Sequence, residues 1–167
     1  MKLKKLNLTK SAIMLMFLAL GFTACDKDPD TPTVKTGELA GSISGVKELD
    51  ASVTYTLTGP VIVEDGGTLT IPAGTTIKAK KGFNSYILVL QGGKINVNGT
   101  AEKPVRMTAD IDNAQPGYWG GLVINGRAPL SGGTIGSTEI SSSFQYGGNI
   151  PNDNSGRITY LILEYTG

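Results

Sequence analysis

Histidine is missing from this 167-residue sequence, and cysteine occurs only once, at Cys25. Without histidine, the commonest zinc and copper ligands are absent, and neither a Ser–His–Asp nor a Cys–His nucleophile can be assembled. A lone cysteine also excludes a disulfide within the chain, so a packed core must hold the fold together. From these absences we predict no catalytic residue of these types, no metal centre and no cofactor.

Long apolar runs are scarce too. The one that exists covers residues 12–22, behind a lysine-rich start and ahead of two small residues and Cys25, an order typical of an export signal. The run is roughly half as long as a transmembrane helix must be, so a permanent membrane span is disfavoured. The small-small-Cys ending resembles the lipobox of bacterial lipoproteins, whose cysteine receives a diacylglycerol. We therefore predict a lipoprotein signal peptide over residues 1–24 and lipidation of Cys25, which makes the membrane a partner.

Acidic residues follow Cys25 directly and resemble a tag that sends lipoproteins of some Gram-negative bacteria to the outer cell surface. In other Gram-negative groups, an Asp at this place retains the protein at the inner membrane. We expect a bacterial outer-membrane protein that is lipid-anchored and exposed at the surface. Residues 25–37 are polar and contain two prolines, which predicts a flexible tether between the lipid and a single domain over residues 38–167.

Concentrated positive charge is missing from the expected mature protein. The full chain has 15 basic and 14 acidic residues, and removal of residues 1–24 takes away four lysines and no acid. The mature part therefore has 11 basic and 14 acidic residues, a net charge of −3. Phosphate binding needs a concentrated basic patch, so we do not expect nucleic acid as a partner.

What the sequence has in quantity is short β-branched runs that end at glycine or proline. Residues 53–57, 69–71 and 95–97 alternate apolar and polar side chains, which predicts strands. No window from residue 53 onward shows a helical repeat, although residues 41–50 are expected to form a short helical turn or cap. The sequence therefore predicts an all-β domain.

Two of these segments repeat. Residues 61–74 (VIVEDGGTLTIPAG) align with residues 87–100 (ILVLQGGKINVNGT) at a constant offset of 26, with Gly-Gly on Gly-Gly. A strand-and-turn repeat of this length predicts a solenoid whose coils stack like on like, such as Leu69 on Ile95. Paired glycines suit a sharp corner. We predict a parallel β-helix; the alternative, a β-sandwich, also has short strands but does not predict repetition in phase.

Three motifs in succession, YTLTGPVIVEDGGTLTIPAGTTIKA (55–79), GTAEKPVRMTA (99–109) and PGYWGGLVINGRAP (116–129), resemble the opening coils of a family of Gram-negative cell-surface lipoproteins. The resemblance implies a right-handed parallel β-helix over residues 37–167 and a molecular function that is mostly uncharacterised. Members of that family are usually much longer, and residues 161–167 resemble a coil from the middle of such a helix. We therefore expect a β-helix that is incomplete at its C-terminal end.

Candidate site residues are few. Asp110 and Asp112 alternate as calcium ligands do, but a full calcium loop needs more oxygen ligands, so a solvated turn is the simpler interpretation. Tyr118 and Trp119 suit either stacking on a sugar ring or covering a corner of the coil, and we favour the structural role. The sequence therefore offers these two aromatic residues as candidate binding residues and the two aspartates as weak metal candidates.

A segment rich in Gly, Ser and Asn, residues 130–156, separates two strand runs and is predicted to form a protruding loop. Loops on rigid scaffolds commonly carry function. Phe144 and Tyr146 lie within this loop and complete the set of candidate binding residues.

Acid–base chemistry on sugars needs carboxylates a few ångströms apart. Acidic residues are sparse, and only Asp110 with Asp112 and Glu64 with Asp65 lie close in sequence, so the sequence leans against an enzyme. We predict a lipid-anchored cell-surface β-helix protein that binds or scaffolds, with a polysaccharide or a surface protein as its partner. A row of exposed aromatic side chains on one face is the expected mark of glycan binding. One alternative is a polysaccharide lyase or glycoside hydrolase, which needs carboxylates and a basic residue within a few ångströms. Another is a structural adhesin or envelope protein without a small ligand.

Overall fold

The computed structural model describes residues 34–167. The predicted signal peptide, Cys25 and most of the predicted tether lie outside these residues, although β1 begins within the range predicted as tether. Within residues 34–167 all regular elements are strands, and no helix is long and apolar enough to cross a membrane. In chain order the strands are β1 (Lys35–Ile43), β2 (Val46–Glu48), β3 (Val53–Val63), β4 (Thr68–Pro72), β5 (Thr76–Ala79), β6 (Gly82–Val89), β7 (Lys94–Asn98), β8 (Val105–Ala109), β9 (Trp119–Ile124), β10 (Gly136–Ser137), β11 (Gln145–Tyr146), β12 (Gly156–Thr159) and β13 (Leu161–Leu163).

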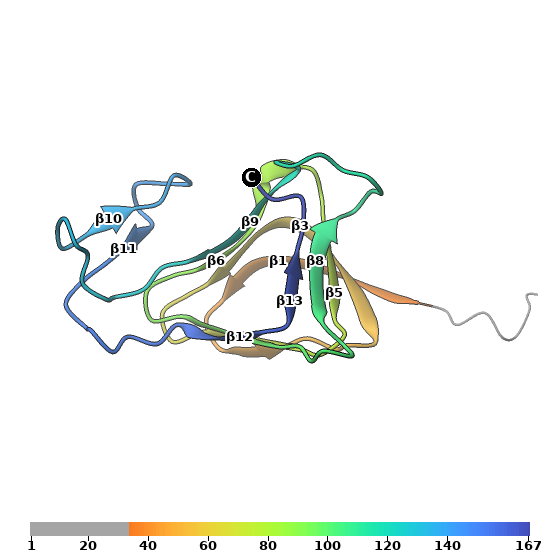
Figure 1. The fold of residues 1–167 in the computed structure, drawn as a ribbon, viewed down its shortest axis with the longest axis horizontal. Helices are drawn as coiled ribbons and strands as arrows, with labels where there is room; N and C mark the ends of the chain where they lie inside the picture. Colours follow the sequence, from red (N-terminus) through yellow and green to blue (C-terminus); the bar gives the residue numbers. More distant parts are fainter. Residues whose placement is uncertain (1–33) are drawn as a thin grey trace, which may run out of the picture. The chain divides into compact units, whose positions relative to one another are not determined.

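The strands stack in parallel into three faces of a coil (Figure 1). Face 1 contains β5, β8 and β13 with the first halves of β1 and β3. Face 2 contains β6 and β9 with the second halves of the same two strands. Face 3 contains β2, β4, β7 and β12. The chain winds through the three faces in turn, which is a parallel β-helix, and these parallel registers exclude a β-sandwich because that fold is built from antiparallel sheets.

The predicted repeat is the register between two neighbouring coils. β4 pairs with β7 so that Leu69 lies on Ile95, and the same offset continues along both strands. At the corner before these strands, the N–H of Gly66 donates to the carbonyl of Gly92 at 3.2 Å. The stacking predicted from the 26-residue offset is confirmed.

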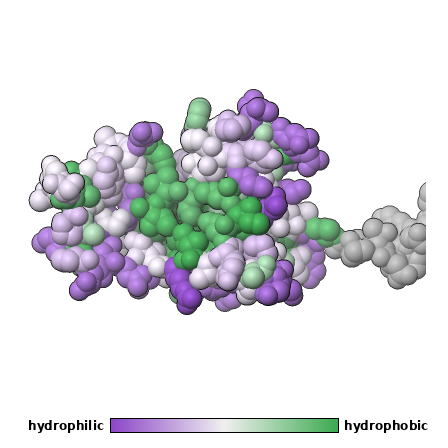
Figure 2. All heavy atoms as spheres, in the orientation of Figure 1, coloured by the Kyte–Doolittle hydropathy of each residue, from purple (hydrophilic) through white to green (hydrophobic). Residues whose placement is uncertain are grey.

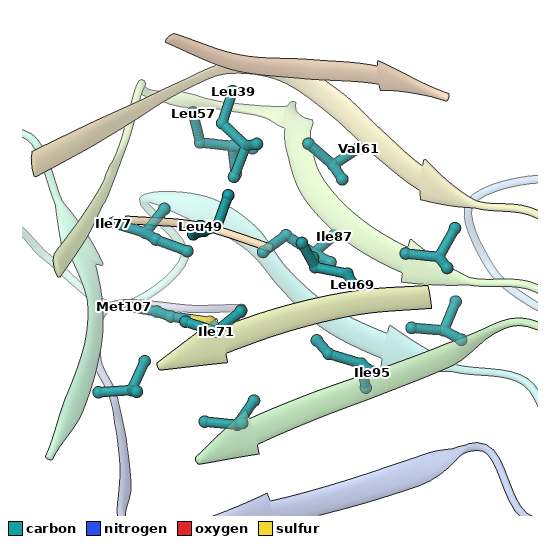
Figure 3. Close-up of a cluster of buried hydrophobic side chains, with 14 of the residues drawn as sticks. Leu39, Leu49, Leu57, Val61, Leu69, Ile71, Ile77, Ile87, Ile95 and Met107 are labelled. Carbon is teal, nitrogen blue, oxygen red and sulfur yellow. The ribbon is translucent and has the colours of Figure 1, made fainter. Parts of the chain in front are cut away.

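An apolar core fills the inside of the coil (Figure 3). Because side chains alternate along a strand, every second residue of each face points inward. Inward residues such as Leu57, Ile77 and Met107 are fully buried. Burial of one such side chain stabilises the fold by about 1.5–3 kcal/mol relative to exposure. The ladder of inward side chains, continued from coil to coil, is therefore the main source of stability.

Residues 41–50 form strands, so the helical turn expected there is wrong. They contain the end of β1 and all of β2, and Ile43 pairs with Val63 on the next coil. Ile43 and Leu49 are both buried in the core. The apolar residues Ile43, Val46 and Leu49 recur every three positions, a spacing that lacks the period-two alternation of a strand. Pairing with the neighbouring coil overrides this local pattern.

One long segment leaves the stack. After β9 the chain departs at Asn125 and rejoins face 3 at β12, and we call residues 126–155 the arm. The arm contains β10 and β11, the one antiparallel pair among the strands of residues 34–167. It extends to one side of the coil (Figure 1) and includes most of the loop that was predicted to protrude.

Candidate ligand groove

A groove of about 900 Å³ lies between face 2 of the coil and the arm. One wall comes from β6, β9 and the residues after β9, and the other comes from the arm, including β10 and β11. Figure 2 shows apolar surface gathered on the side of the molecule that Figure 1 presents, next to the arm. The groove is lined by Phe83, Asn84, Tyr86, Gly120, Val123, Ile124, Asn125, Gly126, Ala128, Pro129, Leu130, Ser137, Thr138, Glu139, Ile140, Tyr146, Gly147 and Gly167.

Each wall of the groove has an exposed aromatic side chain. Phe83 of β6 is 75% exposed, and Tyr146 of β11 is 37% exposed. The position of Phe83 follows from a register shift between Gly82 and Tyr86, where β6 has more residues than the facing part of β9. A bulge of this kind re-aims side chains next to binding sites. The groove thus offers two aromatic surfaces to solvent.

The lining also contains a buried amide without a partner. Asn125 follows β9, and its backbone N–H donates to the carbonyl of Val89 at 2.9 Å, which fixes the residue on the coil. Its side chain is 1% exposed, and its Nδ2 has no hydrogen-bond partner. An unpaired buried donor costs about 1–3 kcal/mol. Among the described residues this is the one buried side-chain nitrogen or oxygen in that condition; Asn125 lines the groove, but its Nδ2 is enclosed by protein atoms.

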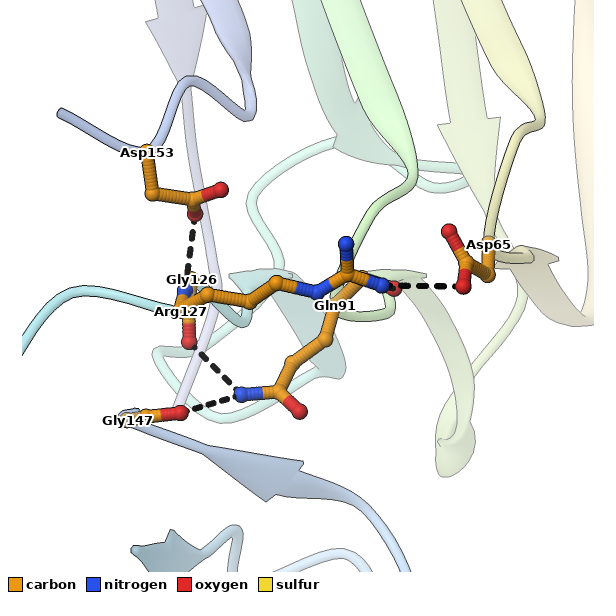
Figure 4. A network of polar contacts seen from close by, with 6 residues as sticks. All are labelled: Asp65, Gln91, Gly126, Arg127, Gly147 and Asp153. Atoms are coloured by element: carbon orange, nitrogen blue, oxygen red, sulfur yellow. Dashed lines mark hydrogen bonds and ion pairs between the residues drawn. The ribbon is translucent and has the colours of Figure 1, made fainter. Parts of the chain in front are cut away.

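Gln91 ties the arm to the coil at two points (Figure 4). Its Nε2 donates to the carbonyl of Gly126, where the arm begins, at 3.0 Å, and to the carbonyl of Gly147 at 2.5 Å. The N–H of Gly147 in turn donates to the carbonyl of Gly126 at 2.8 Å. Because both glycines line the groove, a single amide group of the coil fixes two points of its wall.

Arg127 adds a second attachment (Figure 4). Within the arm, its backbone N–H donates to Asp153 Oδ2 at 2.7 Å. Its Nη2 donates to Asp65 Oδ2 at 2.9 Å and to the carbonyl of Gln91 at 3.2 Å. The Asp65 side chain is 73% exposed, so this ion pair contributes only about 0–1 kcal/mol. The corner therefore holds the arm mainly through hydrogen bonds to the arm's backbone.

Trp119 and Tyr118, two of the candidate binding residues, do not line the groove. Trp119 is fully buried, and its Nε1 donates to the carbonyl of Glu164 at 2.8 Å. The indole therefore packs in the core and presents no face to solvent. Tyr118 is half-buried against the core, and its hydroxyl donates to Asp110 at 2.6 Å.

Asp110, one of the weak metal candidates, already has two donors. The Lys80 ammonium lies 2.7 Å from its carboxylate, and the Tyr118 hydroxyl is the second. Burial raises the pKa of Asp110, but the hydrogen bonds from Lys80 and Tyr118 together with the Lys80 charge outweigh burial and lower the pKa overall. Asp112 is exposed. Within residues 34–167, no three His, Cys, Asp or Glu side chains gather closely enough to hold a metal ion.

The other two candidate binding residues both lie in the arm, but only one of them lines the groove. Tyr146 lines the groove, whereas Phe144 is half-buried within the arm and does not. Sequence reasoning missed Phe83, Asn125 and Gln91. Asn125 had a usable signal, because it is a polar residue between an apolar strand and a glycine, and Phe83 is an aromatic residue at a glycine-marked strand start. Gln91 holds the arm only because the arm folds back beside it, and nothing in the sequence around Gln91 indicates where the arm will lie.

Comparison with known families supports the architecture. A family model described as a pectate-lyase-like β-helix domain matches residues 41–167. This range covers most of the coil, the arm and the groove. No curated protein and no solved structure matches the chain in the other two comparisons.

Proposed function

The chain belongs to the pectate-lyase-like β-helix domain family, and we propose that it binds a glycan in the groove between face 2 and the arm. The observation that carries the proposal is the pair of exposed aromatic side chains, Phe83 and Tyr146, on the two walls of one groove. We also propose the localisation that the signal-peptide sequence predicts: the protein is lipid-anchored on the outer surface of a bacterial outer membrane.

The groove has the size and chemistry of a ligand site. Such sites typically have roughly 300–1,000 Å³ and are mostly apolar, with a few polar groups that fix orientation. An aromatic ring offers a flat apolar surface to the C–H face of a sugar ring. Asn84, Ser137 and Thr138 in the same lining can exchange hydrogen bonds with sugar hydroxyls. The groove therefore combines the two kinds of contact that a glycan needs.

Binding is tested with the purified full chain on a glycan array, followed by titration of the glycans that bind. Phe83→Ala and Tyr146→Ala should each weaken binding by about tenfold or more, as expected for aromatic anchors. Tyr160→Ala is the matched control, because Tyr160 is 61% exposed and does not line the groove. The proposal is wrong if no glycan binds, or if both groove variants bind like the unaltered chain. A chain without glycan binding would favour a structural envelope role.

Lipid anchoring rests on the apolar leader and the lipobox-like approach to Cys25. Cys25→Ala should leave an uncleaved precursor without lipid, which mass spectrometry of the membrane fraction detects. An unaltered chain whose mature N-terminus lies beyond residue 25 and carries no lipid would contradict this part of the proposal.

A polysaccharide lyase is the second candidate, because the corner beside the groove pairs the Arg127 guanidinium with the Asp65 carboxylate and the Arg127 backbone N–H with the Asp153 carboxylate. Elimination from a uronate needs a base for the proton next to the sugar carboxyl and positive charge near that carboxyl. Incubation with polygalacturonate, followed by the ultraviolet absorbance of unsaturated chain ends, separates the two functions. The binding proposal predicts no unsaturated product; product formation that Arg127→Ala abolishes would replace binding by catalysis.

A further inference from the structure

We infer that the last coil of the stack, formed by β9, β12 and β13, is an interface for a second copy of this chain, whose first coil continues the stack head to tail. Association between copies goes beyond the proposed function, which concerns a glycan. Three features of the molecule support it: unpaired strand edges at both ends, an exposed end of the apolar ladder, and a match between the two ends in apolar side chains and charge.

Both ends of the stack have free strand edges. Among residues 34–167, β12 pairs only with β7 and β13 only with β8, while β9 has β6 and a single bridge from Trp119 to Thr166. At the other end, within the same residues, β1 pairs only with β3 and β2 only with β4. A free edge presents N–H and C=O groups that readily pair with another chain. Because the strands of all three faces are parallel, the edges of the last coil can pair with those of a first coil when one copy stacks on the next.

The last coil also exposes the end of the apolar ladder. Ile124, Ile158 and Leu163 are the last inward side chains of faces 2, 3 and 1, and they are 39%, 43% and 41% exposed. Their partners one coil earlier are all fully buried. Figure 1 looks onto this end of the stack, and Figure 2 shows apolar surface in its middle with polar residues around it. An apolar patch with a polar rim marks a surface that binds a partner.

The register gives the neighbours that these side chains would have on a stacked copy. The column of face 2 that ends at Ile124 begins at Ile43. The column of face 1 that ends at Leu163 begins at Gly37. On a stacked copy the end of each column lies next to its beginning, so Ile124 meets an isoleucine and Leu163 meets a residue without a side chain. The exposed end of the ladder would thus be covered by apolar or small residues.

Charge on face 3 favours the head-to-tail direction. One outward column of this face begins at Glu48 and ends at Arg157, and both side chains are exposed. Stacked strands are about 4.8 Å apart, so Arg157 would lie next to Glu48 of the second copy. On face 1, Glu164 would meet Glu38 in the same way, but the Arg106 guanidinium lies 2.6 Å from the Glu164 carboxylate and reduces this repulsion.

Sedimentation velocity of the purified full chain over roughly 1–100 µM tests the interface, because exposed apolar surface and free edges cause association in this range. Head-to-tail contacts do not close, so dimers and longer assemblies should both appear as the concentration rises. Ile158→Lys should weaken association by about tenfold or more, since it places a charge in the middle of the interface. Ile135→Lys is the matched control: Ile135 is an exposed isoleucine of the arm, and its replacement should leave association unchanged.

A charge exchange tests the direction of stacking. At low ionic strength, Arg157→Glu and Glu48→Arg should each weaken association by about threefold or more, because each places like charges next to each other. The variant with both substitutions restores an opposite pair and should associate within about twofold of the unaltered chain. Circular dichroism checks that every variant is folded. If Ile158→Lys does not fold, the charge exchange decides by itself.

Three results would overturn the inference. The first is a chain that remains monomeric up to about 100 µM. The second is association that neither Ile158→Lys nor the charge variants change, which would place the contact elsewhere, the apolar leader included. The third is association that Ile158→Lys abolishes and Glu48→Arg leaves as it was, because the last coils of two copies would then meet each other.

Discussion

The corner between face 2 and face 3 occurs in two forms in this molecule. Between β1 and β2, between β3 and β4 and between β6 and β7 it is a tight turn, which ends in Gly-Gly in the last two cases; before β7 the N–H of Gly93 donates to the carbonyl of Leu90 at 2.9 Å. After β9 the same corner opens at Asn125 into the arm. The tight corners stack on one another, whereas the open corner provides one wall of the groove and the unpaired amide.

The difference shows where the fold restricts the sequence. A Cβ added at Gly93 would lie 2.6 Å from the carbonyl oxygen of Val63, which belongs to the neighbouring coil. A Cβ added at Gly132 in the arm would have nothing within 4 Å. Stacking therefore leaves no room for a side chain at Gly67 and Gly93 of the tight corners, whereas the arm has open positions such as Gly132. In a ligand site between the coil and the arm, the coil provides a rigid wall and the arm provides a wall whose sequence can change.

The largest expected effect comes from breaking the stack itself. Val97→Asp places a charge in the fully buried ladder without a partner and should reduce the free energy of unfolding by about 4 kcal/mol or more, which leaves little folded protein. Asn98→Asp, on the next and outward position of β7, should change it by less than about 0.5 kcal/mol. Urea unfolding followed by circular dichroism measures both. Equal tolerance of the two substitutions would contradict the inward ladder.

The two corners can be compared directly through their glycines. Gly93→Ala should destabilise the protein by about 1–3 kcal/mol, because the new methyl group meets backbone oxygens that cannot move away. Gly132→Ala should be close to neutral, since its methyl group enters open space. The difference in urea midpoint between the two variants is the measurement. A larger loss for Gly132→Ala would reverse the distinction between stacked corner and arm.

The attachment of the arm can be loosened without unfolding the coil. Gln91→Leu removes the two hydrogen bonds to Gly126 and Gly147, each with a net contribution of about 0.5–1.5 kcal/mol. Amide hydrogen exchange should become faster within residues 126–155 and stay unchanged in β4 and β7. Gln145→Leu, an exposed glutamine within the arm, is the control and should leave exchange in both regions as it was. Uniformly faster exchange in the coil would mean that Gln91 supports the core.

The smallest expected effect is a pH dependence of stability that comes from Asp110 on the coil. The pKa of Asp110 is lowered below its ordinary value of 3.8, so its ionised form stabilises the folded state above that value, and this stability is lost as the pH falls through the lower, folded-state pKa. Asp110→Asn should therefore lower the melting temperature slightly near neutral pH and flatten its decline below about pH 4. Asp112→Asn, at an exposed position, should do neither. A decline in the Asp110→Asn variant as steep as in the unaltered chain would contradict the assignment.

The stacked coils could be predicted from the sequence because they obey two local rules. Period-two alternation marks each strand, and the in-phase Gly-Gly pair fixes the register of β4 on β7. Residues 41–50 were included in the predicted β-helix, but their local structure was predicted wrongly, because Ile43, Val46 and Leu49 recur every three residues and pairing with β3 and β4 makes the segment extended. Local pattern is therefore sufficient where neighbouring coils repeat it and insufficient at the beginning of the stack.

The groove could be predicted only in part, because it depends on contacts between distant residues that the repeating pattern of the sequence does not reveal. The loop that contains Tyr146 was identifiable from its Gly, Ser and Asn content, but its position against face 2 is set by Gln91, which lies far away in the sequence. The exposure of Phe83 depends on a register shift between β6 and β9. Trp119, the most prominent aromatic residue of the sequence, is instead used by the core.

The most direct test of the glycan-binding groove is a crystal structure of the protein with a bound oligosaccharide selected by the array. We predict a sugar ring in contact with Phe83 or Tyr146 inside the groove between face 2 and the arm. A sugar bound elsewhere on the molecule, with the groove between face 2 and the arm empty, would contradict the account.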